Sequence, residues 1–527
     1  MAEPSADSAV AAELRRALGP DHVVDQAALA GLTRDYGIFS LRPQAAVRPS
    51  REEHIVRTLE VARRLELPVV ARGGGSNTGG CAVTDGVFLL FDGGAFDHIH
   101  VDSASGSLRC GAGARHDHVQ RAFGEIGLHL PSDPSSGPLT RIGGNVATRA
   151  SGPHALRHGA INRYVRELRF VTVDGVVVDT RHPHTVPDRL VEGLRGIAMT
   201  LSGNEAAVRV LEARRDAKWA SGYELLALLD HADNPVRALP RLLTGSVGTL
   251  GIVTEIELQG LPAPEGRVAL LLRFADEREA CSAASNLRGD AGAIEIVSRS
   301  ALELLRRETD VLREDGRSGA LLIVEFAGFG ADGTARAVAH DVSRSFALTS
   351  NPEIAIDEAM IERIWCERKA LLPLLRRLTR THGVPYSVVN DVGVAPHRLA
   401  DLMTGAHEVF ASHGLVAPVY GHAGSGNLHL RPLFPAGDLA MVSRVADEVY
   451  TLVTELEGTI TAEHGMGRLR SPFLELEWGA EIARAMRQVK ETFDPAGRLN
   501  PDVMFTPPGH RFRTDGWPVT PSLSDPG

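Results

Sequence analysis

Residues 72–80 read Arg72-Gly73-Gly74-Gly75-Ser76-Asn77-Thr78-Gly79-Gly80, and they follow a short apolar segment, 68–71, that predicts a β-strand. This stretch is too rich in glycine for a helix or a strand, so it is expected to form a loop. Backbone N–H groups of such a loop can approach an anion closely, which would suit a diphosphate. It is not a Walker loop, because no Gly-Lys-Ser/Thr closes it, and the spacing of a Rossmann fingerprint is absent. Taken alone, the loop is equally well interpreted as a tight turn.

On both sides of this loop, short predicted strands alternate with helices. We expect helices at 11–18, 50–65 and 116–127, and strands at 86–92, 107–110, 165–172 and 176–179. Ser50 and Glu53 have the spacing of a capping box. The prolines, serines and paired glycines of residues 130–148 predict an irregular segment. After a linker at 261–266, strands at 268–274, 294–297 and 320–326 and helices at 276–287 and 335–346 predict an antiparallel sheet with helices on one face.

A second glycine-rich system lies near the C-terminus, where residues 421–429 read Gly-His-Ala-Gly-Ser-Gly-Asn-Leu-His and residues 463–465 read Glu-His-Gly. Each glycine would weaken a helix by about 1 kcal/mol, so a strand ending at His422, a tight turn and a strand carrying His429 are expected instead. The two imidazoles would then face each other, and Glu463 would complete a His/His/Glu metal site with open positions. Because the chain has 21 histidines, ordinary structural histidines are the alternative.

Four segments in sequence order resemble the FAD-binding domain of the vanillyl-alcohol oxidase and p-cresol methylhydroxylase (PCMH) superfamily: RGGGSNTGG, PSDPSS, IGGNVAT and GSVGTLGIVTEIEL. The resemblance implies an α+β fold, in which a PCMH-type FAD-binding domain precedes a cap domain with an antiparallel sheet and flanking helices. The implied organisation is a helical lead-in (1–40), the FAD-binding domain (41–262), a substrate or cap domain of the FAD-linked oxidase C-terminal type (267–505) and a Pro-rich tail (506–527).

The same resemblance implies which residues bind FAD. The first loop would hold the pyrophosphate, two later segments would line the flavin, and a third would contact the adenine-side half. These residues are Arg72, Gly73, Gly74, Gly75, Ser76, Asn77, Gly79, Gly80, Pro131, Ser132, Asp133, Ser136, Gly143, Gly144, Asn145, Ala147, Thr148, Gly251, Ile252 and Val253. Many relatives attach flavin through a histidine in the first loop. Ser76 and Asn77 stand there in this chain, which favours non-covalent FAD.

YGHAGSGNLHL, EHGMG, FDPAGRLNPDVMF and the WxxR element at 365–368 resemble the D-2-hydroxy-acid dehydrogenase branch of this superfamily, which includes D-lactate, glycolate and D-2-hydroxyglutarate enzymes. The resemblance covers about residues 30–505. It implies a divalent metal, with Zn, Mn and Fe as candidates, that would chelate the substrate. The implied roles are metal ligation by His422, His429 and Glu463, general-base action by His464, carboxylate binding by Arg368, substrate positioning by Asn427 and a flavin contact by Asn500.

The chain departs from this branch at three places. Ser425 stands where relatives usually have an aspartate, which removes a charge that could orient a metal-binding histidine. Val247 replaces a usual glutamate, and residues 149–152 differ from the usual run of small residues. The change at Ser425 puts metal affinity in doubt more than metal identity, whereas the implied ligands and base are intact.

The composition limits function and location. A formal net charge of −10 argues against nucleic-acid binding. No secretory signal or membrane-spanning stretch is recognisable, so the cytoplasm is expected, with peripheral attachment to a membrane left open. Four scattered cysteines argue against an internal iron–sulfur cluster, so an external electron acceptor is expected: an iron–sulfur protein, an electron-transfer flavoprotein or a quinone. A homo-oligomer is compatible with the sequence.

The leading hypothesis is an FAD-dependent, metal-assisted D-2-hydroxy-acid dehydrogenase that takes a small 2-hydroxy acid as its substrate. Three alternatives remain at this point. One is an oxygen-using oxidase, although Ala112, near the position where family members control oxygen access, favours a dehydrogenase. Another is a flavin-binding subunit of a larger redox complex. The third is a non-redox flavoprotein of the same fold, such as an ether-lipid synthase.

Overall fold

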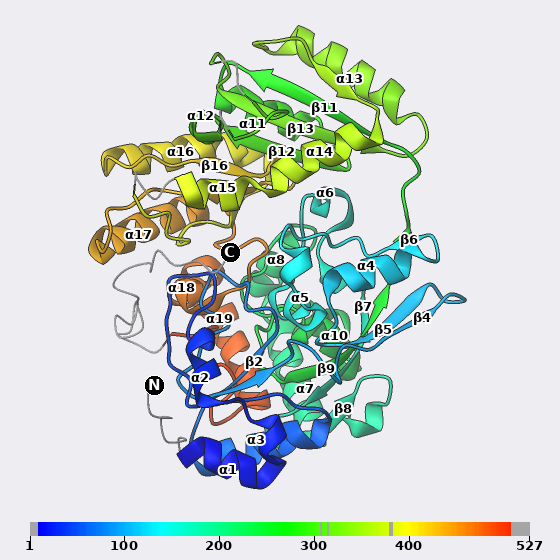
Figure 1. Ribbon diagram of the computed structural model, residues 1–527, viewed down its shortest axis with the longest axis vertical. Coiled ribbons are helices and arrows are strands. Elements are labelled where there is room, and N and C mark those ends of the chain that lie inside the picture. Colours follow the sequence, from blue (N-terminus) through cyan, green and yellow to red (C-terminus); the bar gives the residue numbers. More distant parts are fainter. Residues whose placement is uncertain (1–8, 306–307, 314–315, 379–382, 507–527) are drawn as a thin grey trace.

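The computed structural model describes residues 9–305, 308–313, 316–378 and 383–506, and it shows two units stacked on each other (Figure 1). The N-terminal unit is built mainly from residues 9–262, and the C-terminal unit contains the strands that follow residue 266. Apart from residue 506, the predicted Pro-rich tail lies outside the described residues.

Two sheets form the frame of the N-terminal unit. A parallel sheet has the order β1-β3-β2 and consists of β1 (Ala45–Val47), β3 (Val87–Leu90) and β2 (Val69–Arg72). Every residue of β3 is buried, as expected for a central parallel strand. An antiparallel sheet has the order β4-β5-β9-β7-β8, with β4 (Ile99–Asp102), β5 (Ser107–Gly111), β9 (Ile252–Gln259), β7 (Val165–Val171) and β8 (Val177–Asp179). The strands predicted in this unit are confirmed, and β4 and β9 lie outside the predicted strands.

The first helices agree with prediction, although one cap does not. They are α1 (Ala9–Leu18), α3 (Glu52–Arg64) and α4 (His116–Gly124). The predicted capping box is wrong: Arg51 precedes the first helical residue, and no side chain caps this end of α3. The Ser50 hydroxyl lies 3.4 Å from Nδ1 of His54 instead. The other helices of the unit are α2 (Gln26–Leu29), α6 (Ala155–His158), α7 (Asp188–Ser202), α8 (Glu205–Ala213), α9 (Leu226–Asp230) and α10 (Leu239–Leu243).

Residues 142–148 form a short helix, α5 (Ile142–Thr148), so the expectation of an irregular segment is wrong there. The reason lies in packing. A Cβ on Gly143 would come within 2.8 Å of Ala112, so this glycine lets α5 approach the end of β5 closely. Tertiary contact thus outweighs the weak helix propensity of paired glycines. The helix stops where Arg149 adopts a φ of 55°.

Seven antiparallel strands form the sheet of the C-terminal unit, in the order β14-β11-β13-β12-β16-β17-β15. They are β14 (Glu353–Ala355), β11 (Arg267–Phe274), β13 (Ala320–Ala327), β12 (Ala293–Ser298), β16 (Val419–His422), β17 (Asn427–Leu430) and β15 (Val392–Gly393). A short pair, β6 (Leu128–His129) with β10 (Leu261–Pro262), connects the linker to the N-terminal unit. The predicted antiparallel sheet is confirmed.

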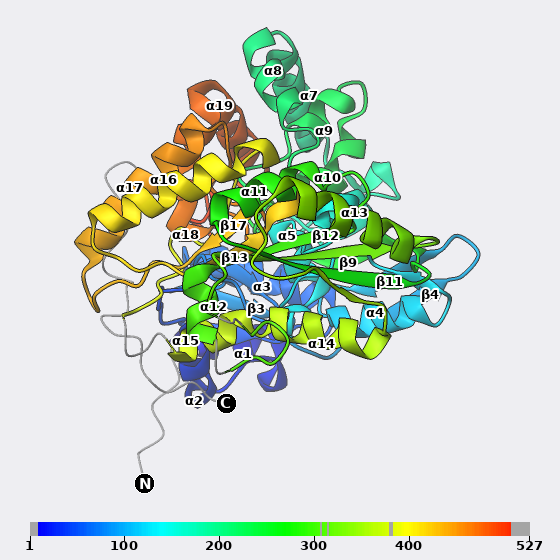
Figure 2. The same ribbon diagram turned by 90° about the horizontal axis from the view of Figure 1, so that it is seen from above.

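Helices cover both faces of this sheet, and the expectation of one covered face is wrong. Alternate residues of β11 and β13 contribute to two separate apolar clusters. One cluster includes α11 (Glu277–Asn286), α13 (Ala331–Ser345) and α16 (Leu399–Ser412). The other includes α12 (Arg299–Leu305), α14 (Glu358–Lys369) and α15 (Leu371–Leu378). Figure 2 shows α14 and α15 on one side of this sheet and α13 and α16 on the other. The ring of Trp365 on α14 lies 5.4 Å from that of His154 in the N-terminal unit, so α14 reaches the interface between the units.

The last described segment returns to the N-terminal unit. After α17 (Leu439–Glu455) and α18 (Gly467–Arg470), α19 (Leu474–Phe493), which is kinked at Gly479, packs against α7 and α8 (Figure 2). Leu499 then pairs with Val69 beside β2. The predicted domain boundaries remain a prediction, but this packing groups residues 474–504 with the N-terminal unit. None of the helices in the described ranges is long and apolar enough to span a bilayer.

Candidate active site between the two units

One cavity is lined by both glycine-rich systems. The predicted cofactor-binding residues that line it are Arg72, Gly73, Gly74, Gly75, Ser76, Asn77, Ser136, Gly143, Gly144, Asn145, Ala147, Thr148, Gly251 and Val253. The predicted catalytic and metal-binding residues that line it are Arg368, His429, Glu463 and His464. Segments far apart in the sequence therefore meet at one hollow, as a cofactor and its substrate require.

The first glycine loop has little spare room. A Cβ on Gly74 would lie 2.1 Å from the backbone oxygen of Leu139, so only glycine fits that position. Arg72 links the start of the loop to two other segments, because its guanidinium donates to the backbone oxygen of Arg34 at 2.8 Å and to that of Ala82. Burial lowers the pKa of Arg72. The loop residues 73–77 line the cavity, which fits the predicted pyrophosphate cradle.

Seven predicted cofactor-binding residues lie outside the cavity lining: Gly79, Gly80, Pro131, Ser132, Asp133, Ile252 and Asn500. The amide nitrogen of Asn500 donates to the backbone oxygens of Cys81 and Val247, at 2.9 and 2.7 Å. Asn500 therefore ties two cavity-lining segments together. The bond reaches the backbone of Val247, so this tie does not depend on the side chain that departs from the family pattern.

The predicted metal ligands converge. The hairpin expected at residues 419–430 is confirmed, with Tyr420 opposite His429 in the β16–β17 pair. Nε2 of His422 lies 3.4 Å from Nε2 of His429 and 3.1 Å from Oε1 of Glu463, and the third separation is 3.5 Å. Ligand atoms about 2.1 Å from a tetrahedral Zn²⁺ are about 3.4 Å apart. The three atoms thus have the spacing of three ligands of one divalent cation.

The hydrogen bonds on the far sides of the rings orient these ligands. Nδ1 of His429 donates to the backbone oxygen of Asn390 at 2.9 Å, and burial, with His422 nearby, holds the pKa of His429 well below its usual range. Its Nε2 therefore presents a lone pair. Nδ1 of His422 lies 2.7 Å from Oε1 of Glu295, whose charge raises the pKa of His422 against the effect of burial. A proton on His422 or a cation can satisfy the converging lone pairs, so the donor set fits a metal.

Glu295 supplies the negative charge that orients His422, which the sequence lacks at Ser425. The Ser425 hydroxyl donates to the backbone oxygen of His422 at 3.2 Å and does not reach the ring. The carboxylate that orients His422 comes instead from β12, the neighbouring strand of the sheet. Sequence reasoning missed Glu295. Its only local signal is a charged residue within the buried strand 293–298.

Glu463 has two further partners that the sequence did not reveal. Nζ of Lys218 lies 2.8 Å from its Oε2, and the Ser151 hydroxyl donates to the same oxygen at 2.9 Å. Burial opposes the charged form of Glu463, yet Lys218 and His422 together hold its pKa well below its usual range. Oε2 is therefore occupied, and Oε1 is the oxygen that faces the two histidines.

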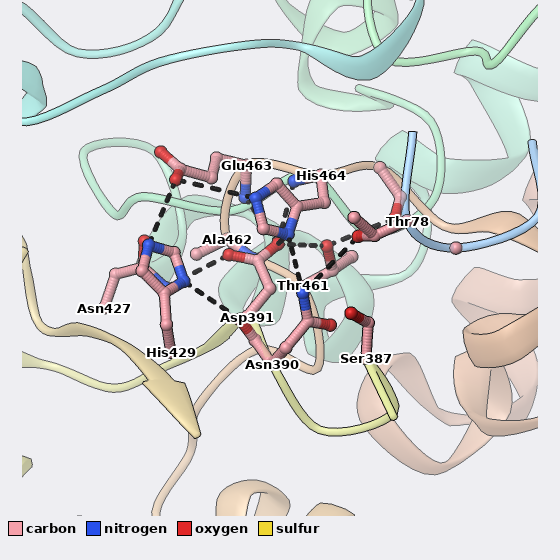
Figure 3. Close-up of polar contacts among 12 residues, drawn as sticks. Thr78, Ser387, Asn390, Asp391, Asn427, His429, Thr461, Ala462, Glu463 and His464 are labelled. Carbon is pink, nitrogen blue, oxygen red and sulfur yellow. Dashed lines mark hydrogen bonds and ion pairs between the residues drawn. The ribbon is translucent and has the colours of Figure 1, made fainter. Parts of the chain in front are cut away.

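His464 lies beside the metal-ligand set. Its ring stacks on that of His429 with centroids 5.5 Å apart, and Nδ1 lies 3.6 Å from Oδ2 of Asp391 (Figure 3). Burial lowers the pKa of His464, which keeps the imidazole neutral and able to accept a proton. His464 lines the cavity, as a base must if it is to reach a substrate.

Asp391, another residue missed by the sequence analysis, holds this loop in place. Its Oδ2 accepts the backbone N–H groups of residues 462, 463 and 464 and the hydroxyl of Thr461 (Figure 3). Asp391, His429, Glu463 and His464 also place ligand atoms within 4.8 Å of one another. Because four donors already occupy Oδ2 of Asp391, we interpret this residue as a support for the loop and retain His422, His429 and Glu463 as the ligand set.

The two remaining predicted site residues, Asn427 and Arg368, differ in how many of their hydrogen-bonding groups are already paired. The amide of fully buried Asn427 donates to Asp391 and to the backbone oxygen of Val392, and its oxygen accepts from Lys218. Asn427 is thus committed to internal bonds with Lys218, Asp391 and Val392 and lies outside the cavity lining, so its predicted role in positioning substrate stays a prediction. Arg368 forms an ion pair with Glu295, and its Nε has no hydrogen-bond partner among the described residues. That N–H is available to an anion.

Comparison with known proteins is consistent with this geometry. Residues 43–181 match the family "FAD binding domain", and residues 263–504 match "FAD linked oxidases, C-terminal domain". The chain is 27% identical to glycolate oxidase subunit GlcD of Bacillus subtilis, covering 89% of this chain and 90% of the relative. It is 25% identical to D-lactate dehydrogenase of Archaeoglobus fulgidus, over 86% and 90% of the two chains.

Two further comparisons differ in extent. The chain is 26% identical to D-2-hydroxyglutarate dehydrogenase of Haemophilus influenzae, covering 90% of this chain but 49% of that relative, so it spans about half of that protein. A solved structure of alkyldihydroxyacetonephosphate synthase superposes with a TM-score of 0.61 at 17% identity, covering 95% of this chain and 86% of that one, which shows a common fold. Both domain families are matched in order, so the chain carries an FAD binding domain followed by the C-terminal domain of FAD linked oxidases, and it matches the PCMH-type flavoprotein superfamily.

Proposed function

We propose that this protein is an FAD-dependent, metal-assisted dehydrogenase that oxidises a D-2-hydroxy acid to the corresponding 2-keto acid. The observation that carries the proposal is the convergence of the His422, His429 and Glu463 ligand atoms beside His464, on a cavity that the glycine loop also lines. Relatives named as glycolate oxidase subunit, D-lactate dehydrogenase and D-2-hydroxyglutarate dehydrogenase support the substrate class.

Bound FAD would supply a two-electron acceptor, and a bound Zn²⁺, Mn²⁺ or Fe²⁺ would lower the pKa of the substrate hydroxyl. The residues of the chain bind, orient and move a proton. Arg368 offers its unpaired N–H to the substrate carboxylate. Neutral His464 takes the hydroxyl proton while the α-hydrogen leaves with its electron pair, so that a C=O bond forms. The glycine loop and α5, which line the cavity, would hold the cofactor.

Re-oxidation of the flavin is proposed to use an external acceptor. All four cysteines, Cys81, Cys110, Cys281 and Cys366, are free thiols, and they are too scattered in the sequence to hold an iron–sulfur cluster. An iron–sulfur protein, an electron-transfer flavoprotein or a quinone would then receive the electrons. A cytoplasmic location and a homo-oligomeric state belong to the same proposal.

The test is an anaerobic flavin-reduction assay. Purified protein is mixed with D- and L-2-hydroxy acids, with and without a chelator, while the visible flavin band is recorded. We expect a D-acid to bleach the band, and chelation to prevent this. His464→Ala should slow reduction by a factor of about 10² to 10⁴, because a general base contributes that much. His397→Ala, at an exposed histidine outside the cavity lining, serves as the matched control.

Two results would contradict the proposal. Flavin that no 2-hydroxy acid reduces would exclude the dehydrogenase assignment and favour a flavin-binding subunit. Reduction that is equally fast in wild type and His464→Ala would exclude His464 as the base. Admitting air after reduction separates the remaining alternative, since an oxidase would recover its yellow colour within a few turnovers.

A further inference from the structure

Arg431 is a buried arginine on the wall of the same cavity. It directly follows β17, lies two residues after His429 and continues the pairing, because its N–H donates to the backbone oxygen of Pro418. Residues two apart on a strand face the same side, so Arg431 shares the face of the sheet that carries His429. It is 2% exposed and lines the cavity together with Arg368 and His464.

The charge of Arg431 has no acidic partner among the described residues. Its Nη1 donates to the Ser387 hydroxyl at 2.8 Å and its Nη2 to the Tyr420 hydroxyl at 3.3 Å. Its Nε has no hydrogen-bond partner in the described part of the chain. Two neutral hydroxyls are a weak compensation, because an unpaired charge removed from water costs several kcal/mol.

Other buried arginines of this protein are compensated differently. Arg368 pairs with Glu295, and Arg149 lies 3.3 Å from Glu224. Arg470 donates to two backbone oxygens and to the amide oxygen of Asn390, and it does not line the cavity. Arg431 therefore combines burial, a cavity position and an unmatched positive charge, which together call for an anion entering from the cavity.

We propose that Arg431 binds a second anionic group of the substrate, so that the preferred substrate is a short 2-hydroxy diacid. This rests on the proposed function, in which Arg368 binds the carboxylate next to the hydroxyl. The guanidinium carbons of Arg368 and Arg431 lie 5.0 and 5.9 Å from the centre of the Tyr420 ring. Two cationic subsites thus flank one aromatic ring, which would contact the hydrocarbon chain between two carboxylates. The Ser387 and Tyr420 hydroxyls complete the second subsite.

The experiment compares two acids that differ only at the far end. D-2-Hydroxyglutarate carries a second carboxylate, whereas D-2-hydroxypentanoate has the same number of carbons and ends in a methyl group. Rates of anaerobic flavin reduction are measured against acid concentration for wild type, Arg431→Met and Arg431→Lys. Arg398→Met is the control, since that arginine is exposed and pairs with Asp401. We expect wild type and control to prefer the diacid at least 30-fold in efficiency, Arg431→Lys to keep part of the preference, and Arg431→Met to reduce it to below about threefold.

The outcomes separate this inference from the proposed function. Equal use of both acids by wild type, or an unchanged preference in Arg431→Met, would overturn the inference while leaving the dehydrogenase intact. Equal losses on both acids with a shifted flavin potential would assign Arg431 to the cofactor and also overturn it. If neither acid reduces the flavin, the proposed function fails. In that case Arg431 is tested by titrating the protein with glutarate and recording the change in the flavin absorption band. Weaker glutarate binding by Arg431→Met than by wild type supports the subsite, and equal binding excludes it. Flavin content and circular dichroism verify that each variant folds.

Discussion

His154 offers a sharp test of how the two units are held together. Its Nδ1 lies 2.7 Å from Oδ2 of Asp133 in the N-terminal unit, and its Nε2 lies 2.8 Å from Oε1 of Glu325 on β13 in the C-terminal unit. Trp365, on the helix that carries Arg368, donates to the other oxygen of Glu325 at 2.5 Å. Burial opposes the charged imidazole, yet Asp133 and Glu325 raise the pKa of His154 to about 10.

The magnitude follows from this raised pKa. Because it lies above the unfolded value of 6.5, the stabilisation is fully present below pH 6.5 and is lost as the pH rises to about 10. Each tenfold gain in proton affinity on folding corresponds to about 1.4 kcal/mol, so the upper limit is about 5 kcal/mol, of which roughly half remains at pH 8. Removing the cation leaves the buried carboxylate of Glu325 and the partly buried one of Asp133 without their partner, which costs about 3 kcal/mol.

The assay is thermal unfolding of the FAD-loaded protein as wild type and His154→Gln at pH 6, 8 and 10.5. At about 2 °C for each kcal/mol, we expect the variant to unfold about 6 °C lower at pH 6, about half of that at pH 8, and at the same temperature as wild type at pH 10.5. His407→Gln is the control, because its partner Glu277 lies in a partly exposed pair that should contribute less than about 1 kcal/mol. If wild type and His154→Gln differ in unfolding temperature by the same amount at pH 6 and pH 10.5, or do not differ at all, the charged state of His154 between Asp133 and Glu325 is refuted.

Two further changes test the cofactor and metal sites. Lys218→Met should remove the ion pair that holds Oε2 of Glu463. We expect elemental analysis after dialysis to show at least threefold less bound metal than in wild type. Unchanged metal content would mean that the Ser151 hydroxyl alone holds the carboxylate. Gly74→Ala should place a methyl group 2.1 Å from a backbone oxygen and reduce FAD content by about tenfold or more. The control Gly31→Ala, where a Cβ would have no described atom within 4 Å, should keep its FAD. Equal FAD content in both variants would contradict the close packing of the glycine loop.

Local sequence patterns predicted much of the architecture. The glycine loop, the strands around it and the β16–β17 hairpin depend on residues a few positions apart, so propensity and spacing suffice. The convergence of His422 and His429 was therefore accessible from the chain alone. Two of the errors share a cause, which is contact between distant segments: α5 forms because Gly143 packs closely on Ala112, a contact that no local pattern contains. The covering of both sheet faces likewise depends on which helices return to the sheet.

The sequence by itself determined the class of site: a glycine-rich cradle, two histidines on a hairpin, a carboxylate and a neighbouring histidine. Only the tertiary structure decided how the charges at that site are compensated. Glu295 reaches His422 across 127 positions, and Lys218 reaches Glu463 across 245. Arg431 donates to two hydroxyls and, within the described ranges, to no carboxylate. The physical reason is that buried charges are paired through space. The order of strands in a sheet, which sequence spacing does not encode, determines which of them meet.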